Sequence, residues 1–287
     1  MTLSIVPVSE DERGRGALTQ ESTLAALTGL HEGGATILRG AFTPEFIDQL
    51  YAEFCARHGG HNLAGMSALA QAPFPNPIQK VGDGRFEIAM RMSGLFGQPV
   101  LFANPLLMNF LQPLLGRDLM RLGSVTAVAS FPGAEMQHIH RDHPQLFHEF
   151  PQIGPALPMY AVNVSIPMID VDATTGPTAI WPGSHRWPEK QEASPQMGMV
   201  SVPFQRGDAI LMDYRTMHTG LPNRSQTVRP ILYLVYTREW FFDDNNHRGR
   251  TPLDISLQQL QLLPAELNKL MMRAAQQQVR VIQLSNS

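Results

Sequence analysis

Apolar residues near the N-terminus recur at helical spacing and frame one short strand. The stretch Ser22–Leu30 has a helical pattern, and Gly34–Gly40 after it alternates as a strand does. A longer helix is expected from Thr43, placed as its N-cap, with Pro44 in the first helical position. Gly59 is placed to end this helix.

The pattern changes in the central part of the chain. From about Gly123 to Trp240 the apolar residues fall in short β-rich runs separated by Gly, Pro, Asn and Asp. Such spacing favours an all-β barrel or sandwich. A helix over Asn104–Gly116 precedes this region, and Ser256–Gln278 after it is helical again, with Pro264 starting a second piece.

These patterns predict one mainly β domain. No repeat or linker divides the chain, so residues 1–287 are expected to fold together. A helical layer is expected at about 20–116, a β-barrel core at about 120–242 and C-terminal helices at about 253–278. An apolar content of 43% with 16% charged residues agrees with a well-packed globular protein.

Charge and cysteine content narrow the classes of function. A net charge of −3 with no basic block argues against a nucleic-acid partner. Cys55 is the only cysteine, which excludes an internal disulfide framework and a cysteine-rich metal site. The N-terminal apolar run is short and followed by acidic residues, and no segment approaches the ~18 apolar residues of a membrane span. We expect a soluble, cytoplasmic protein with a small-molecule substrate and no membrane partner, and a homodimer is a candidate assembly.

Candidate metal ligands gather in one stretch, EMQHIHRDHPQLFHEF, residues 135–150. If this stretch ends a strand, His138, His140 and Asp142 share one face. His138 and Asp142 would then lie roughly 13 Å apart, so only a neighbouring pair reaches one ion: His138 with His140, or His140 with Asp142. The remaining ligand must come from elsewhere in the chain.

His218 is the distant candidate, since it follows an apolar run and precedes a Gly-Leu-Pro-Asn turn. Combined with His140 and Asp142 it makes two imidazoles and one carboxylate. That triad leaves coordination positions open and suits non-haem iron(II) chemistry with oxygen. Zinc more often takes a closed tetrahedral set.

Several motifs in order resemble the phytanoyl-CoA dioxygenase family. They are His-Arg-Asp, then TTGPTAIWPGSHR, then GD followed by H-x-G-x-x-N-x-S-x-x-x-R. HEGGATILRGAFTPEFIDQL is similar to the N-terminal opening of the family, so the resemblance covers roughly residues 31–242. The family consists of iron(II)- and 2-oxoglutarate-dependent oxygenases. The resemblance implies their double-stranded β-helix, a jelly-roll, cupin-like barrel, here with flanking N- and C-terminal helices.

The resemblance also implies residue roles. His140, Asp142 and His218 would bind iron(II) and form the catalytic centre. Arg229, 11 residues after His218, would receive the distal carboxylate of 2-oxoglutarate, a task suited to a bidentate guanidinium. Thr178 in the Gly-Pro-Thr motif and Gln137 in the Gln-x-x-His-Arg-Asp motif would be further contacts to 2-oxoglutarate.

Two positions depart from the family pattern. Thr175 replaces the usual asparagine before Gly-Pro, and Gly220 lies where some members have a serine that helps bind 2-oxoglutarate. Candidates for substrate contacts are Arg85, Arg91, His138 and Tyr160. His143 and His148 are expected to have no part in metal binding, and His185 to stabilise a turn. An apolar mouth is expected from Phe147, Phe150, Met159, Tyr160, Trp181, Trp187 and Trp240.

Together these features predict an iron(II)- and 2-oxoglutarate-dependent dioxygenase that uses O2 and releases succinate and CO2. The expected reaction is hydroxylation of an unactivated C–H bond in a small, hydrophobic metabolite or natural-product intermediate. Because the carboxylate ligand Asp142 is present, the resemblance disfavours halogenation, whereas desaturation, rearrangement and peroxide formation stay open. Two alternatives are a cupin-like metal enzyme without 2-oxoglutarate, either an isomerase or a cofactor-independent dioxygenase, and a non-catalytic binding barrel.

Overall fold

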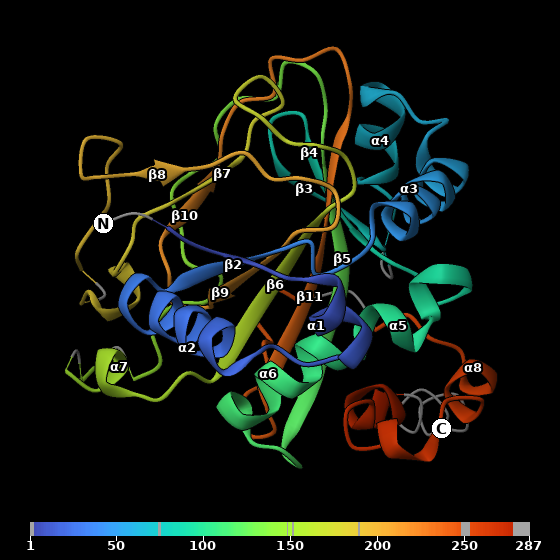
Figure 1. Ribbon diagram of the computed structural model, residues 1–287. Coiled ribbons are helices and arrows are strands. Elements are labelled where there is room, and N and C mark those ends of the chain that lie inside the picture. The colour runs from blue at the N-terminus through green and yellow to red at the C-terminus, as the bar shows by residue number, and fades with distance from the viewer. Residues whose placement is uncertain are drawn as a thin grey trace.

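Two β-sheets face each other in the computed structural model (Figure 1), which describes residues 3–73, 76–147, 149–150, 152–188, 190–247 and 253–277. Residues of both sheets line one cavity. The major sheet has eight strands, in the spatial order β1 (Ser4–Pro7), β2 (Ala35–Arg39), β9 (Ala209–Asp213), β6 (Ala161–Pro167), β11 (Arg229–Arg238), β5 (Met120–Ser130), β4 (Arg85–Ala89) and β3 (Ile78–Gly82). The minor sheet contains β10 (His218–Gly220), β7 (Thr178–Ile180) and β8 (Val200–Ser201). The predicted mainly β class is confirmed.

The strands do not close into a barrel. In the described part of the chain, β1 and β3 stand at opposite ends of the major sheet and do not pair with each other. The minor sheet is also small, with strands of two or three residues. The two sheets therefore enclose the cavity as facing layers, and the continuous hydrogen-bonded barrel that we expected is absent from these residues.

Helices cover the outside of the major sheet (Figure 1). In chain order the helical segments of the described residues are α1 (Glu10–Arg15), α2 (Gln20–Thr28), the π-helical turn η1 (Gly29–Gly33), α3 (Pro44–His58), α4 (Leu63–Leu69), η2 (Gly94–Gly97), α5 (Pro99–Phe102), α6 (Pro105–Leu115), α7 (Ile153–Ala156), η3 (Ser184–Arg186), α8 (Leu257–Gln261) and η4 (Ala265–Leu267). The outer layer includes α3, α5 and α6, whereas α7 and η3 contact each other. Residues 272–277 are helical as well, and Gln278, the expected last helical residue, lies outside the described ranges.

Local signals account for the two main predicted helices. The Thr43 hydroxyl accepts a hydrogen bond from the backbone N–H of Phe46, and α3 ends before Gly59, as expected. The side-chain oxygen of Asn104 likewise accepts from the N–H of Leu106 at 3.0 Å and starts α6. The predicted strand at residues 34–40 is confirmed as β2.

The helix expected at Ser22–Leu30 begins and ends slightly earlier. It starts at Gln20 because the Thr19 hydroxyl caps it, accepting from the N–H of Ser22 at 3.2 Å. Beyond Thr28 the chain widens into the π-helical turn η1 before β2 begins.

Strands β3 and β4 lie within the region expected to be a helical layer. They form an antiparallel hairpin whose turn is Asp83–Gly84, with Gly84 at φ +67°. Such an Asp-Gly pair is a hairpin signal, which makes this strand pair a departure from the helical layer expected here. Strand β4 pairs with β5, placing Arg85 opposite Ser130. This hairpin extends the major sheet along the side of the cavity.

Alternation along β5 divides the core from the cavity. Ser124, Thr126 and Val128 line the cavity, whereas Val125 and Ala127 point to the opposite face and join the main hydrophobic core. Apolar side chains from α3 and α6 complete this core, so the helices stabilise the sheet from outside. The inner face of the sheet lines the cavity with polar as well as apolar side chains.

Gly207, at the turn before β9, tests the packing of the N-terminal layer. It has φ +97°, and a Cβ there would lie 2.5 Å from the carbonyl oxygen of Phe42, whereas Gly198 has φ +76° and open space. We expect Gly207→Ala to lower the free energy of unfolding by about 3 kcal/mol and Gly198→Ala by about 1 kcal/mol, because only the former adds a clash to the backbone strain. Urea unfolding measures both, and equal losses would contradict the packing described.

Candidate metal site and adjoining cavity

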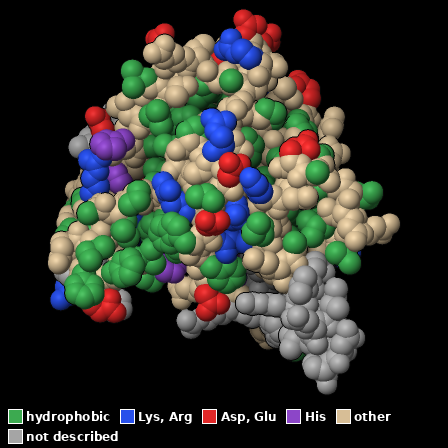
Figure 2. Space-filling model, turned by 90° about the horizontal axis from the view of Figure 1, so that it is seen from below, with side chains coloured by type: hydrophobic (Ala, Val, Ile, Leu, Met, Phe, Trp, Pro, Cys, Tyr) green, Lys and Arg blue, Asp and Glu red, His purple; other side chains and the backbone are tan. Residues whose placement is uncertain are grey.

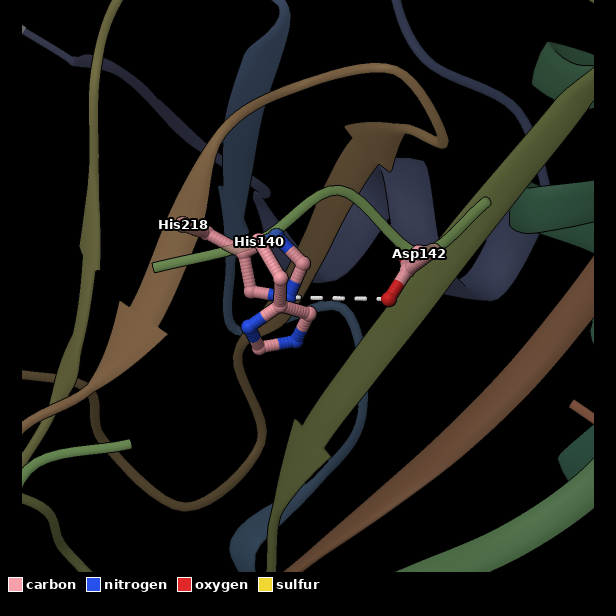
Figure 3. Close-up of side chains that lie close together, drawn as sticks. All are labelled: His140, Asp142 and His218. Carbon is pink, nitrogen blue, oxygen red and sulfur yellow. Dashed lines mark ion pairs between the residues drawn. The ribbon is translucent and has the colours of Figure 1, made fainter. Parts of the chain in front are cut away.

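Three candidate ligands meet at one edge of the cavity. His218 opens β10, and His140 lies in a loop whose backbone pairs with it: the N–H of each donates to the carbonyl of the other, at 3.0 and 2.8 Å. The N–H of Asp142 donates to the carbonyl of Tyr214 at 3.2 Å. Figure 3 shows the two imidazoles and the carboxylate turned toward one another.

The triad has the geometry of a metal site. One donor atom from each of His140, Asp142 and His218 lies within 4.8 Å of the other two, and Nε2 of His218 is 3.5 Å from Oδ1 of Asp142. His140 Nδ1 lies 2.8 Å from the carbonyl of His138, and His218 Nδ1 lies 3.0 Å from that of Thr216. Since a carbonyl only accepts, both Nδ1 atoms carry the proton, and each Nε2 keeps a lone pair for a metal.

Burial shifts the pKa values of all three candidate ligands. It lowers the pKa of His140 and of His218 to about 4, with His218 adding to the shift at His140. Both imidazoles are therefore neutral near pH 7. Burial also raises the pKa of Asp142 to about 6, while Asn163 Nδ2 donates to its Oδ2 at 3.1 Å and orients it.

The donor set fits a non-haem iron(II) ion. Two neutral imidazoles and one carboxylate would occupy three coordination positions of such an ion and leave others open, and all three residues line the cavity. A divalent cation there would neutralise the buried carboxylate, whose protonation burial otherwise favours.

The cavity has a volume of about 750 Å³ and a mixed lining. All three triad residues belong to its wall, and so do the predicted residues Gln137, His138 and Thr178. The apolar part of the wall is Val81, Val128, Ile139, Pro144, Met217 and Val235. The polar part also contains Lys80, Glu87, Ser124, Thr126, Asn163, Tyr214, Tyr233, Asn245, Asn246 and His247.

Two buried arginines lie in one row across the inner face of the major sheet. Ser130 on β5 pairs with Arg229 on one side and with Arg85 on the other, so the three side chains share a face. All three are at most 1% exposed. Among the described residues, Arg85 Nη1, Ser130 Oγ and Arg229 Nε are buried without a hydrogen-bond partner. Burial, then the charge of Arg229, lowers the pKa of Arg85 to about 10.

Thr178 and Gly220 of the minor sheet, with Gln137 from the loop beside it, form the cavity wall in front of this row. Thr178 pairs with Gly220 in the β7–β10 ladder, and the N–H of Gly220 donates to Gln137 Oε1 at 3.2 Å. A Cβ at Gly220 would lie 2.5 Å from Gln137 Oε1 and 2.9 Å from Arg85 Nη1. The volume that a serine side chain would need at position 220 is thus filled by Arg85 and Gln137.

The departure at Thr175 belongs to a turn. Its hydroxyl accepts from the N–H of Asp172 at 2.8 Å, and Gly176 follows with φ +82°. Thr178 lines the cavity, whereas Thr175 does not.

The other sequence candidates separate clearly. His138 is exposed on the cavity wall, whereas Arg91 is exposed on the surface and is not part of that wall. His143 packs against Phe241 with ring centroids 5.2 Å apart, and His185 is buried with Nε2 3.2 Å from the carbonyl of His31, consistent with its expected role in a turn. His148 lies outside the described residues.

The expected apolar mouth is wrong, because none of its seven residues lines this cavity. Trp181 and Tyr160 are buried in the interior, while Phe147, Phe150 and Trp240 are exposed. Figure 2 shows hydrophobic side chains gathered on the left of the face seen from below. The sequence shows which residues lie close to the motifs, but it does not show which of them face the cavity.

Asn163 is a site residue that the sequence reading missed. It sits in AVNVSIP, where every residue of β6 is buried, so a lone amide in an apolar strand was the available signal. Arg85 gave a weaker signal, since only the pairing of β4 with β5 brings it beside Arg229.

No helix among the described residues combines the length and apolar character that crossing a membrane requires.

Removing one ligand tests the metal site. We expect His218→Ala to weaken iron(II) binding at least about 100-fold, because the remaining imidazole and carboxylate cannot complete the triad. His138→Ala is the matched control, since its ring lies beside that of His140 but outside the ligand group. Anaerobic iron(II) titration measures both, and similar affinities for the two variants would contradict the assignment.

The chain is similar in sequence to known dioxygenases over much of its length. The family model for phytanoyl-CoA dioxygenase (PhyH) matches residues 30–231. The chain is 24% identical over 275 residues to Dioxygenase FUM3 of Gibberella moniliformis, covering 90% of this chain and 86% of that protein. It is 32% identical over 114 residues to the iron/alpha-ketoglutarate-dependent dioxygenase ausO of Aspergillus calidoustus, or 37% of each chain.

A solved structure shares the fold. The epimerase SnoN in complex with Fe3+, alpha ketoglutarate and nogalamycin RO superimposes with a TM-score of 0.55 at 18% identity, covering 77% of this chain and 85% of that one. The predicted cupin-like fold is therefore confirmed in its two-layer form. Because the family model spans most of the chain, including all three candidate ligands, the chain belongs to the phytanoyl-CoA dioxygenase family.

Proposed function

We propose that this chain hydroxylates an unactivated C–H bond of a small, hydrophobic metabolite or natural-product intermediate, with release of succinate and CO2. Its family is one of iron(II)- and 2-oxoglutarate-dependent enzymes, and the donor set suits that metal. The observation that carries the proposal is that the triad shares a cavity wall with Gly220, and that the buried row of Arg85 and Arg229 lies directly behind Gly220.

His140, Asp142 and His218 are the proposed iron ligands. Their arrangement leaves open positions that face the cavity, where 2-oxoglutarate and oxygen would bind. When bound, iron(II) with 2-oxoglutarate and O2 supplies an oxidant strong enough to attack an unactivated C–H bond. The protein holds the ligands in place: backbone carbonyls fix both imidazoles and Asn163 orients the carboxylate.

The distal carboxylate of 2-oxoglutarate is proposed to bind at the arginine row. Gly220 lies two residues beyond His218 on β10, about 7 Å along the strand, and faces Arg85. A carboxylate there would accept from Arg229 and Arg85, and Ser130 could donate its hydroxyl, which would satisfy the buried polar atoms that lack partners. Thr178 of the minor sheet and Gln137 of the loop beside it complete the proposed contacts.

The substrate is proposed to enter on the side of β4 and β5. There the wall combines apolar Val128 and Val235 with polar Glu87, Ser124 and Thr126. The apolar part would hold the carbon skeleton near the metal, and the polar part would orient it. Hydroxylation is the proposed outcome, and the fold of SnoN, named as an epimerase, makes inversion of a carbon centre the second outcome to examine in product analysis.

The class of reaction is testable without knowing the substrate. Anaerobic addition of iron(II) and 2-oxoglutarate is expected to give a visible charge-transfer band, because the cosubstrate chelates the metal. Admission of oxygen should then yield succinate, at a slow rate without substrate. A chain that binds iron(II) yet gives neither band nor succinate would favour a cupin-like enzyme without 2-oxoglutarate, and one that binds no metal would favour a non-catalytic barrel.

Substitutions in the arginine row separate cosubstrate binding from metal binding. We expect Arg229→Gln to weaken 2-oxoglutarate about 100-fold and Arg85→Gln about tenfold, since each removes charged hydrogen bonds to a buried carboxylate. Iron(II) affinity should stay near that of the unchanged chain. Arg91→Gln, an exposed arginine from the same part of the chain, is the control. Equal losses of iron(II) and 2-oxoglutarate in Arg229→Gln would show that its role is misassigned.

A further inference from the structure

A short segment after β11 forms part of the cavity wall. Asn245, Asn246 and His247 all line the cavity, although they follow the last strand of the major sheet. Just before them, Asp243 is only 5% exposed while its neighbour Asp244 is exposed. A buried carboxylate beside an exposed one needs a physical explanation, because burying a charge is costly unless it is well hydrogen-bonded.

Asp243 accepts three hydrogen bonds. The hydroxyl of Tyr214 donates to Oδ2 at 2.7 Å, and the backbone N–H of Asn246 donates to Oδ1 at 2.9 Å. The side-chain amide of Asn246 donates to Oδ2 at 2.8 Å. Burial raises the pKa of Tyr214 well above its ordinary value, so its hydroxyl stays a donor. No ion pair to Asp243 occurs within the described ranges, and these neutral donors hold the carboxylate.

Both partners of Asp243 also hold the backbone of the metal ligand Asp142. The carbonyl of Tyr214 accepts from the N–H of Asp142 at 3.2 Å, and the side-chain amide of Asn246 donates to the carbonyl of Asp142. Asp142 is thus fixed on both sides of its Cα by residues that meet at one buried carboxylate.

Packing supports the same connection. Phe241 contacts the ring of His143, the residue after Asp142, and lies 6.0 Å from the ring of Tyr214. The segment that begins at Phe241 therefore covers the ligand loop with aromatic contacts before it turns into the cavity wall.

We infer that Asp243 is a positioning residue that connects the cavity wall at residues 245–247 to the carboxylate ligand Asp142. The position of this ligand then depends on the position of that part of the wall. The inference rests on the proposed function only in taking Asp142 as a metal ligand. Asp243 itself does not contact the metal site; it acts through Tyr214 and Asn246. Loss of the carboxylate would release Asn246 from Asp142 and loosen the ligand geometry.

Cobalt(II) binding tests this inference, because the visible absorption of cobalt(II) reports the arrangement of its ligands and needs no 2-oxoglutarate. We expect Asp243→Asn to weaken cobalt(II) binding about tenfold and to alter the spectrum, as substitution of outer partners of metal ligands does. Tyr214→Phe, which keeps the carbonyl and removes only the hydroxyl, should change both in the same direction. The double variant should add little to Asp243→Asn, since both act through one network. Asp244→Asn is the matched control.

Thermal unfolding of the metal-free variants separates positioning from stability. If Asp243→Asn and Tyr214→Phe lower Tm but leave cobalt(II) affinity and spectrum unchanged, Asp243 is purely structural and the inference is overturned. Should Asp243→Asn fail to fold, unchanged cobalt(II) binding in Tyr214→Phe would overturn it equally. An unchanged chain that binds cobalt(II) but gives no band with iron(II) and 2-oxoglutarate would end the proposed function and leave this inference standing.

Discussion

The backbone of His140 exchanges two hydrogen bonds with that of His218, and this exchange joins an irregular loop to the edge of the minor sheet. A further backbone hydrogen bond, from the N–H of Gln137 to the carbonyl of Gly220 at 3.0 Å, holds the same loop against β10. Because the pairing uses main-chain atoms, both imidazoles remain available, and each is then oriented by a carbonyl two residues earlier in its own segment. The metal site is therefore built on backbone pairing first and on side-chain chemistry second.

The two sheets divide the chemistry between them. The minor sheet and its attached loop supply neutral imidazoles and one carboxylate, whereas the major sheet supplies the positive row at Arg85 and Arg229. Guanidinium groups buried this deeply are unfavourable without a negatively charged partner. An anion with two carboxylates, such as the proposed 2-oxoglutarate, would reach from the candidate metal site to the arginine row. The helices outside the major sheet stabilise this arrangement, since the core they complete lies on the opposite face from the cavity.

Much of the site could be read from the sequence because its residues lie in short, ordered motifs. His218 and Arg229 begin two consecutive strands, β10 of the minor sheet and β11 of the major sheet, so a short stretch of sequence contributes to both sheets. Arg85 and Asp243 could not be assigned this way, since their roles depend on pairing with Ser130 and Tyr214, which are far away in the chain. The prediction of an apolar mouth was wrong for a related reason. A residue close to a motif in the sequence can lie on either side of its strand or loop.

Gly220 has a consequence for how this site can vary. The ends of the Arg85 and Gln137 side chains occupy the space where a Cβ at position 220 would lie. Because both ends are flexible, a serine at position 220 would make the guanidinium of Arg85 and the amide of Gln137 shift. The present positions of these two side chains therefore depend on the absence of a side chain at position 220.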